Sequence, residues 1–551
     1  MRYFIKIVFI LFVQNIFSQE IPEHISSVGV YDFIDELALE GVIEPNDVVK
    51  PYTDKSIYNY LNKAKIHLDK LNKRQILDLE FYLKEFSYFE PFVSNTKTQN
   101  SFIDKYLDQF NLSLYPLGYR YKDSLFYLDI RPIWGIDYYK NDKGTNYHRW
   151  GGGLLKMNMG KHFSGWASLR DNNLSEVFNR KEYFTTDRGG NFKGSKSGGG
   201  DFSEMRGGVA YSWDWGSLSM SKDHVEWGSN YHGANILSPK APSFAQIKLH
   251  LKPAKWADFN YMHGWLVSNV IDSVRSYITR DGNRRDVMHP KYVAANMFTI
   301  FPFKGINFSF GNSIIYSDMN PHPAYLIPFM FFKSVDHWLN STDDAGVGVG
   351  QNSQMFINLS IKRLMHFNFY ASVFIDELKV ARINEKDKYN LYSYKIGAKY
   401  SNGFISNMAL TAEYTKTTPG TYQHYISTTT FESSSYNLGH YLRDNSDELY
   451  FAIAYKPFSE FRTVLEYTKA RHGNSFKYIH GNDIITHAAL REIKWTNEII
   501  GLSVSYEFPY NNFIKLAFIY NNAKGDDLKL FTPDFYQGEN KTIVFGINMG
   551  F

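Results

Sequence analysis

The chain has 551 residues, of which 44% are hydrophobic and 17% aromatic, and its formal net charge is only +4. So small a charge gives no basis for binding nucleic acid, and any preference for an acidic ligand must come from local patches. The absence of cysteine excludes a disulfide framework, a Cys-ligated metal site and a lipid anchor on Cys.

Residues 1–18 have the organisation of a signal peptide. Arg2 and Lys6 form a short basic region, an apolar run follows, and Ser18 stands at the expected cleavage point. The run is shorter than the roughly 20 apolar residues of a membrane-spanning helix. Since no longer apolar run follows, the exported chain is predicted to be either soluble or a closed β-barrel.

Residues 19–92 have the apolar spacing of α-helices. A first helix is predicted to end at Gly41, a second to begin after Thr53, and a third to begin with a capping-box sequence at Asn72. Pro91 is expected to stop the third helix. Three short amphipathic helices need a partner surface, so we expect a cap over the periplasmic end of the remaining chain.

Residues 93–551 are predicted to form a large antiparallel transmembrane β-barrel, and their number allows about 16 to 18 strands. From about residue 110 apolar residues alternate with small or polar ones, which is typical of strands that face lipid outside and a lumen inside. A β-sandwich has the same alternation, but the signal peptide, the aromatic content and an apolar terminal strand favour the barrel. The clearest apolar face, in that terminal strand, consists of Ile543, Phe545, Ile547, Met549 and Phe551.

Four changes in composition predict long loops between strands. They are rich in Gly, Ser, Asp or basic residues, which interrupt the alternation. The loops are expected at residues 189–200, 275–291, 343–354 and 421–445.

No complete enzyme signature is present, so the chain is predicted not to be an enzyme and to need no cofactor or metal. The segment 219–238 combines aromatic, carboxylate and amide side chains, which suit a saccharide because rings stack on sugars and fixed polar groups bind hydroxyls. An alternative interpretation makes Trp227 a residue of the interfacial girdle and the charges a network in the lumen. The candidate ligand-binding residues here are Asp223, Glu226, Trp227 and His232.

Several segments, in this order along the chain, resemble the Wzi-type capsule assembly proteins. They are Val30–Gly41, Val49–Thr53, Trp227–Gly228, Ile236–Ser238, Pro242–Phe244, His263–Trp265, Tyr325–Pro328, Phe374–Leu378 and the terminal Phe551. The resemblance covers nearly the whole chain, although none of these motifs is diagnostic by itself. It implies an 18-stranded outer-membrane barrel with periplasmic helices and a plugged lumen, acting as a surface lectin that retains capsular or extracellular polysaccharide.

The resemblance also adds candidate ligand-binding residues. Trp265 lies in one of the similar segments, and a basic loop that contains Arg284 and Arg285 would meet an anionic capsule. Alternatively, that loop is merely solvated or contacts lipid phosphates. The expected partners are therefore polysaccharide, outer-membrane lipid and the barrel assembly machinery, and the sequence carries no indication of oligomeric state.

Two other functions fit the same sequence. A barrel of this size could be a diffusion channel, with Glu413, Glu466, Arg462 and Arg471 as lumen-lining residues. The chain could also be an accessory part of a surface motility or adhesion apparatus, such as one for gliding motility.

Overall fold

The computed structural model describes residues 20–89, 112–114, 117–194, 198–340, 350–362, 364, 366–380, 390–476 and 489–550. The predicted signal peptide, Pro91, Phe551 and residues 343–349 of one predicted loop lie outside the described residues. Across the described part of the chain, no helix combines the length and the apolar character needed to span a membrane.

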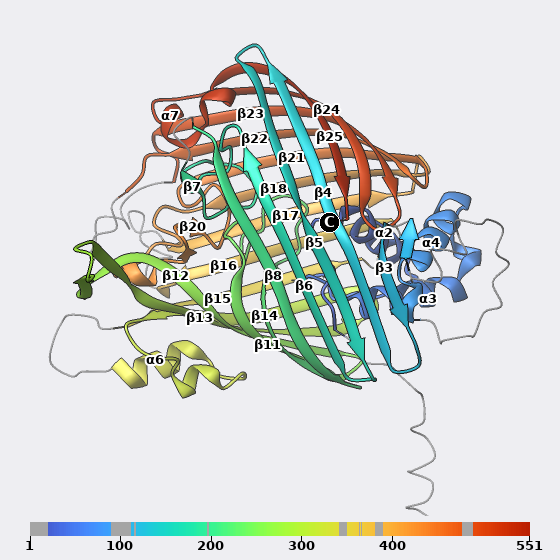
Figure 1. Ribbon diagram of the computed structural model, residues 1–551, viewed down its shortest axis with the longest axis horizontal. Helices are drawn as coiled ribbons and strands as arrows, with labels where there is room; N and C mark the ends of the chain where they lie inside the picture. The colour runs from blue at the N-terminus through green and yellow to red at the C-terminus, as the bar shows by residue number, and fades with distance from the viewer. Residues whose placement is uncertain are drawn as a thin grey trace, which may run out of the picture.

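Eighteen antiparallel strands close into a barrel, as predicted (Figure 1). The last wall strand pairs with the first along Trp134–Lys140, which completes the cylinder. Next to this seam, β3 (Leu117–Lys122) pairs with the other half of the same edge, and β2 (Leu112–Leu114) pairs with β3. The wall strands are β4 (Phe126–Asn141), β5 (Gly144–Met159), β6 (Phe163–Leu174), β8 (Gly200–Trp213), β9 (Gly216–Asp223), β11 (Phe244–Ala254), β12 (Ala257–Ile278), β13 (Arg284–Phe303), β14 (Ile306–Ser317), β15 (Asn352–Ile361), β16 (Phe367–Glu377), β17 (Leu391–Ser401), β18 (Met408–Thr417), β21 (Ser446–Phe458), β22 (Phe461–Gly473), β23 (Ile493–Phe508), β24 (Asn512–Lys524) and β25 (Gly538–Met549).

The outer face of the barrel is apolar, as the alternation predicts. In β25 the side chains of Ile543 and Phe545 are exposed, whereas Val544 between them is buried. Large aromatic side chains are exposed at the end where the connections are short turns, for example Trp256 and Phe303. Outer-membrane barrels have an apolar outer band, aromatic girdles and short periplasmic turns, so this end is the periplasmic one.

Three helices cover the periplasmic end and share a core of their own (Figure 1). They are α2 (Val28–Leu39), α3 (Asp54–Ile66) and α4 (Lys73–Glu85), with 3-10 turns η1 (Leu68–Lys70) and η2 (Ser87–Phe89). The predicted caps are present: Gly41 has a left-handed φ of 66°, Thr53 accepts from the backbone of the first turn of α3, and Asn72 forms a reciprocal capping box. The third helix ends at Glu85, before the predicted stop.

The lumen is filled. We define the luminal plug as residues 20–27, 45–53, 224–243 and 418–445. Within it β1 (Val49–Lys50) pairs with β10 (Glu226–Trp227), which joins the N-terminal segment to the connection after β9. The fourth part, residues 418–445, carries η5 (Ser427–Thr429) and the hairpin of β19 (Glu432–Ser433) and β20 (Tyr436–Asn437). The predicted loop 421–445 therefore folds into the barrel rather than away from it.

The filled lumen overturns one part of the predicted pattern. The inner face of β12–β16 was expected to be polar, but Met262, Val293, Met297 and Phe356 are buried there in one apolar cluster with the plug. These side chains face protein, so their burial is favourable in the same way as in a globular core. The alternation by itself takes no account of the plugged lumen that the resemblance implies, so it predicts a polar inner face where the plug provides an apolar partner.

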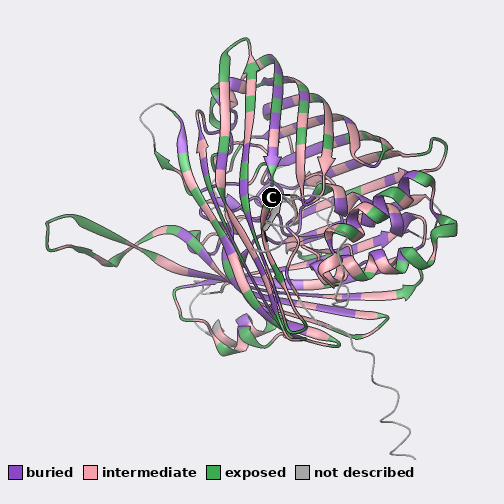
Figure 2. Cartoon of the chain, turned by 45° about the vertical axis from the view of Figure 1, so that its right-hand side comes forward, coloured by how far each residue is buried: buried purple, intermediate pink, exposed green. Residues whose placement is uncertain are grey.

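The predicted loop at residues 275–291 is instead mostly strand. β12 runs to Ile278 and β13 begins at Arg284, so the two strands continue beyond the wall as a two-stranded ribbon. Figure 2 shows the ribbon projecting from the barrel with exposed residues along its length. Both of its faces meet solvent, so its sequence lacks the apolar alternation that identifies a wall strand.

Two further connections carry short helices. Residues 318–340, which we call the external segment, contain η3 (Pro323–Leu326) and α6 (Phe332–Asn340) and lie on the outside of the wall (Figure 1). The connection before β25 contains α7 (Leu528–Phe531) and η7 (Asp534–Tyr536), and β7 (Lys193–Gly194) pairs with the start of β8.

Candidate functional site

The predicted segment 219–238 begins in β9 and then enters the barrel, where residues 224–238 belong to the plug. Asp223 ends β9 and is almost completely buried. Its carboxylate accepts from the Arg206 guanidinium at 3.2 Å and from the backbone N–H of His224 at 2.8 Å. These contacts fix the point at which the chain leaves the wall and turns into the lumen.

Glu226 and Trp227 form the strand that pairs with the N-terminal segment. The Lys50 ammonium donates to Oε1 of Glu226 at 2.9 Å, so an ion pair accompanies the backbone pairing. Trp227 is only 3% exposed, and its ring meets Phe356 edge-on at a centroid distance of 6.0 Å. Its ring belongs to the core of the plug and not to an interfacial girdle, so a sugar could stack on it only if the plug moved.

His232 connects the same loop to the opposite wall. Its ring stacks on Tyr450 with centroids 4.3 Å apart, and Nδ1 lies 3.0 Å from Oε1 of Glu448. Burial alone would lower the pKa of His232, but the Glu448 carboxylate outweighs burial and raises that pKa above its ordinary value. The ring is therefore an anchor with a charge-assisted hydrogen bond.

Glu413 organises this contact. It accepts from the backbone N–H of Tyr231 at 2.7 Å and of His232 at 3.0 Å, and from the Tyr370 hydroxyl at 2.6 Å. The Lys395 ammonium donates to the same carboxylate at 2.9 Å, and both side chains are at most 1% exposed. Sequence reasoning placed Glu413 only in the lumen of a channel. Its actual role depends on a loop that lies far away in sequence, and no local signal identifies it.

Two of the other residues predicted to line a channel, Arg462 and Arg471, form ion pairs. The Arg462 guanidinium pairs with Asp32 of α2 at 2.7 Å, so it binds the helical cap. Arg471 pairs with Asp447 at 2.5 Å. In β21, Asp447 is three positions from the luminal Tyr450 and therefore points to the opposite face. Arg471 lies directly opposite Asp447 in β22, so this pair is on the outer face and does not line the lumen.

Trp265 and the two arginines lie elsewhere. Trp265 points outward from β12, where its ring meets the ring of His263 at 4.9 Å beside the external segment. Arg284 and Arg285 are exposed on the ribbon, where Arg284 pairs with Asp286 at 2.7 Å. The seven predicted residues are thus divided among the plug, the outer wall and the ribbon, and their role in binding a ligand stays a prediction.

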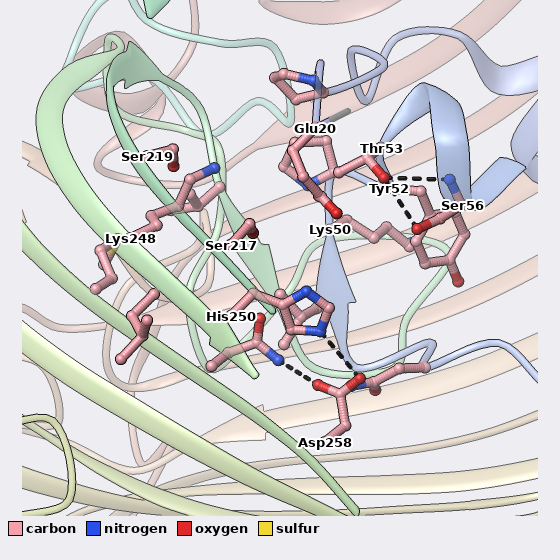
Figure 3. Close-up of a pocket in the computed structure, with 18 of the residues that line it drawn as sticks. Glu20, Lys50, Tyr52, Thr53, Ser56, Ser217, Ser219, Lys248, His250 and Asp258 are labelled. Atoms are coloured by element: carbon pink, nitrogen blue, oxygen red, sulfur yellow. Dashed lines mark hydrogen bonds and ion pairs between the residues drawn. The ribbon is translucent and has the colours of Figure 1, made fainter. Parts of the chain in front are cut away.

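The plug leaves small cavities on either side of the β1–β10 pairing. One cavity, of about 120 Å³, lies between the N-terminal segment and the wall formed by β9, β11 and β12 (Figure 3). A second, of about 190 Å³, lies between the plug and α2. Since small-molecule sites generally measure about 300–1,000 Å³, neither cavity accommodates an oligosaccharide.

Polar side chains of β11 and β12 line part of the cavity in Figure 3. His250 lies 3.1 Å from the Asp258 carboxylate, which also accepts from Asn260 at 2.7 Å. On the plug side, burial raises the pKa of the Glu20 carboxyl. At the wall, the His250, Asp258 and Asn260 side chains thus bind one another rather than reaching into open space.

One group of potential metal ligands lies together among the described residues, consisting of His24, Asp223 and His224. His24 Nε2 lies 3.4 Å from Nδ1 of His224, and the far nitrogen of His224 lies 3.3 Å from the Glu204 carboxylate. The two rings are therefore hydrogen-bonded to each other within the plug, and the Glu204 carboxylate of β8 lies close to the second ring. The Arg206 guanidinium on Asp223 opposes a cation, so the group fits these contacts better than a metal.

Comparisons with known proteins bear on the fold. No family model matches the sequence, and no curated protein matches it either. The chain is similar to the structure of Wzi from Escherichia coli, described as an outer membrane protein involved in group 1 capsule assembly and a carbohydrate-binding β-barrel. The identity is 12%, the alignment covers 94% of this chain and 98% of that one, and the TM-score is 0.54.

OprD from Pseudomonas aeruginosa aligns more loosely, with 9% identity, 76% of this chain and 94% of that one covered, and a TM-score of 0.39. The likeness to Wzi extends over the whole barrel and concerns the fold. Together with the apolar outer face and the aromatic girdle, it supports one conclusion: this chain has the fold of an outer-membrane β-barrel and is located in the outer membrane.

Proposed function

We propose that this protein binds polysaccharide at the cell surface and helps to assemble or retain it there. The observation that carries the proposal is the filled lumen. Plug segments enter from the N-terminus and from two extracellular connections and leave cavities of only about 120 and 190 Å³. A barrel of this width whose interior is occupied by its own chain is suited to presenting a surface rather than to passing solutes.

The similarity of fold to Wzi, which is a carbohydrate-binding barrel, supports the same function. The surface open to the outside consists of the extracellular connections and the ribbon. On the ribbon, Arg280 and Arg285 are exposed and form no ion pair with another described residue. Because exposed guanidinium groups recognise carboxylate and phosphate groups, we assign the ribbon to an anionic polysaccharide.

Binding of the purified protein to the polysaccharide extracted from its own cells tests the proposal. Replacement of Arg280, Arg284 and Arg285 by Gln is expected to weaken binding about tenfold at low salt, from roughly 0.5 kcal/mol for each exposed charge. Arg149→Gln is the matched control, since Arg149 is exposed on another strand of the wall. If the wild-type protein binds no extracted polysaccharide, and deletion of its gene leaves surface polysaccharide unchanged, the proposal fails.

Measurement of conductance tests the alternative function of a diffusion channel. The protein in a planar bilayer is expected to be silent, because the plug is held by buried contacts on both sides. Steady single-channel currents from the wild-type protein would show that the plug opens and would favour a diffusion channel.

A further inference from the structure

The external segment has an unusual position for an extracellular connection. It leaves the barrel after Ser317, at the extracellular end of β14, and then lies on the outer surface of the wall. There Tyr325 and Phe332 are fully buried against outward-facing wall residues such as Tyr316. Because the plug covers the inner face, residues 292–297 of β13 and 312–317 of β14 are thus buried on both faces of the sheet.

Outward-facing polar side chains of the wall hold the backbone of this segment. The Asn296 amide donates to the carbonyls of Pro328 and Met330, both at 2.9 Å. Asn312 accepts from the backbone N–H of Phe332 at 2.9 Å. Facing lipid, these amides would be costly, and here they satisfy irregular backbone instead.

A tyrosine adds a third such contact. The Tyr261 hydroxyl donates to the carbonyl of Tyr325 at 2.8 Å. The wall and the segment thus complete one another's hydrogen bonds, which is the condition under which non-helical backbone is tolerated at membrane depth.

The outermost surface of the segment is apolar. The exposed fraction is 57% for Phe329 and 76% for Trp338. Further exposed apolar side chains on the same segment are Leu326, Ile327 and Phe331. Around this surface α6 turns Val335 and Leu339 toward the wall.

The depth of this surface follows from strand register. Phe329 stacks on Phe259 with centroids 4.5 Å apart and lies near Phe298. Phe298 pairs with Phe310, which pairs in turn with Ile357. Phe310 and Ile357 are exposed on the lipid-facing band, so Phe329 lies at the same level as residues that meet acyl chains.

We infer that the external segment is embedded in the outer leaflet of the membrane, with Leu326, Ile327, Phe329 and Phe331 in contact with acyl chains. Its apolar surface continues the lipid-facing band without a break, and its backbone is satisfied by the wall. Trp338, together with Lys333 and His337 on α6, provides the interfacial anchors that amphipathic helices use at headgroup level. The segment is therefore a lipid contact and not part of the surface that meets solvent outside the cell.

The absence of cysteine makes a direct test possible. Phe329→Cys and Leu326→Cys, each carrying a nitroxide label, are reconstituted as the full chain in vesicles of phosphatidylcholine and phosphatidylglycerol. Ile357→Cys is the lipid-facing control, and Val274→Cys is the aqueous control because Val274 is 95% exposed on the ribbon. Gel electrophoresis without heating confirms that each variant is folded, because a folded barrel migrates differently from the heated, unfolded chain.

Labels at positions 329 and 326 are expected to match position 357, with high oxygen accessibility and a collision rate with a nickel chelate several-fold below that at position 274. A nickel collision rate equal to that at position 274 would overturn the inference. In cells, a photo-cross-linking residue at position 329 is expected to give no protein adduct. An adduct with a second copy or with another protein would assign the surface to that partner and would equally overturn the inference.

Discussion

Replacing Glu413 by alanine tests whether the plug is fixed by a buried charge network. In the wild-type protein the carboxylate accepts from two backbone N–H groups of the plug, from Tyr370 and from Lys395. Removing it leaves the Lys395 ammonium, whose side chain is fully buried, with only the carbonyl of His232 at 2.6 Å as a hydrogen-bond partner. An uncompensated buried charge costs about 3–5 kcal/mol, so the free energy of unfolding should fall by that amount.

Replacing Lys395 by alanine should lower the free energy of unfolding by less, because Glu413 has more hydrogen-bond partners left than Lys395 has in the first variant. In Lys395→Ala the carboxylate keeps three donors, two from backbone and one from Tyr370. Hydrogen bonds to a charged group contribute about 1.5–3 kcal/mol each, so we expect a loss of only about 1–3 kcal/mol. Glu413→Gln keeps the shape of the side chain, and its loss of unfolding free energy should lie between those of the two alanine variants.

Denaturant unfolding of the three variants in lipid vesicles, followed by tryptophan fluorescence, measures these differences. Two-state behaviour has to be checked by comparing fluorescence with a gel assay of the folded fraction. If Lys395→Ala destabilises the protein as much as Glu413→Ala, the asymmetry argument is wrong. If neither variant loses more than about 1 kcal/mol, the network is not buried as described.

Three further outcomes are expected. Because the folded-state pKa of His232 is raised, its charge contributes stability that is fully present below the unfolded value of about 6.5 and is lost as pH rises through the folded pKa. The free energy of unfolding of the wild type should therefore exceed that of His232→Gln by less at pH 9 than at pH 5.5. A difference that stays constant with pH would contradict this role of His232. Asn296→Leu removes both amide donors to the external segment, and protease cleavage within residues 318–340 should accelerate in vesicles, whereas unchanged cleavage would show that apolar contacts suffice. Lys399→Met removes the 2.7 Å ion pair with Asp35 of α2, so amide hydrogen exchange in α2 should become faster relative to β25, which serves as the internal reference. Equal exchange rates of α2 in the mutant and the wild type would refute a role of Lys399 in holding the cap.

Local features of the fold could be predicted from sequence because they depend on neighbouring residues. The alternation in β25 and the capping box at Asn72 both follow from interactions within a few positions, and both are present. The inner face of β13 could not be predicted in the same way. Val293 and Met297 are apolar because plug segments from three distant parts of the chain pack on them.

The candidate site shows the same limit. For segment 219–238, the alternative interpretation of its charges as a network in the lumen agrees with their contacts, but its placement of Trp227 in the girdle is wrong. Nothing local distinguishes a tryptophan that stacks on a sugar from Trp227, which packs on Phe356 across the lumen. The ribbon was missed for a related reason. Its two strands are stabilised by pairing with each other, as in Tyr277 opposite Arg285, and no buried face marks them in the sequence.

The seam between β4 and β25 has a consequence for the order of assembly. It joins the first and last strands of the wall, so it carries the largest loop-closure entropy of all the strand pairings and forms after the others. By then residues 20–27 and 45–53 have to lie inside the growing sheet, because Glu23 pairs with Lys156 of β5 and β1 pairs with β10 in the interior. The plug therefore acts as an internal template on which the sheet curves before the hydrogen bonds between β4 and β25 close the barrel.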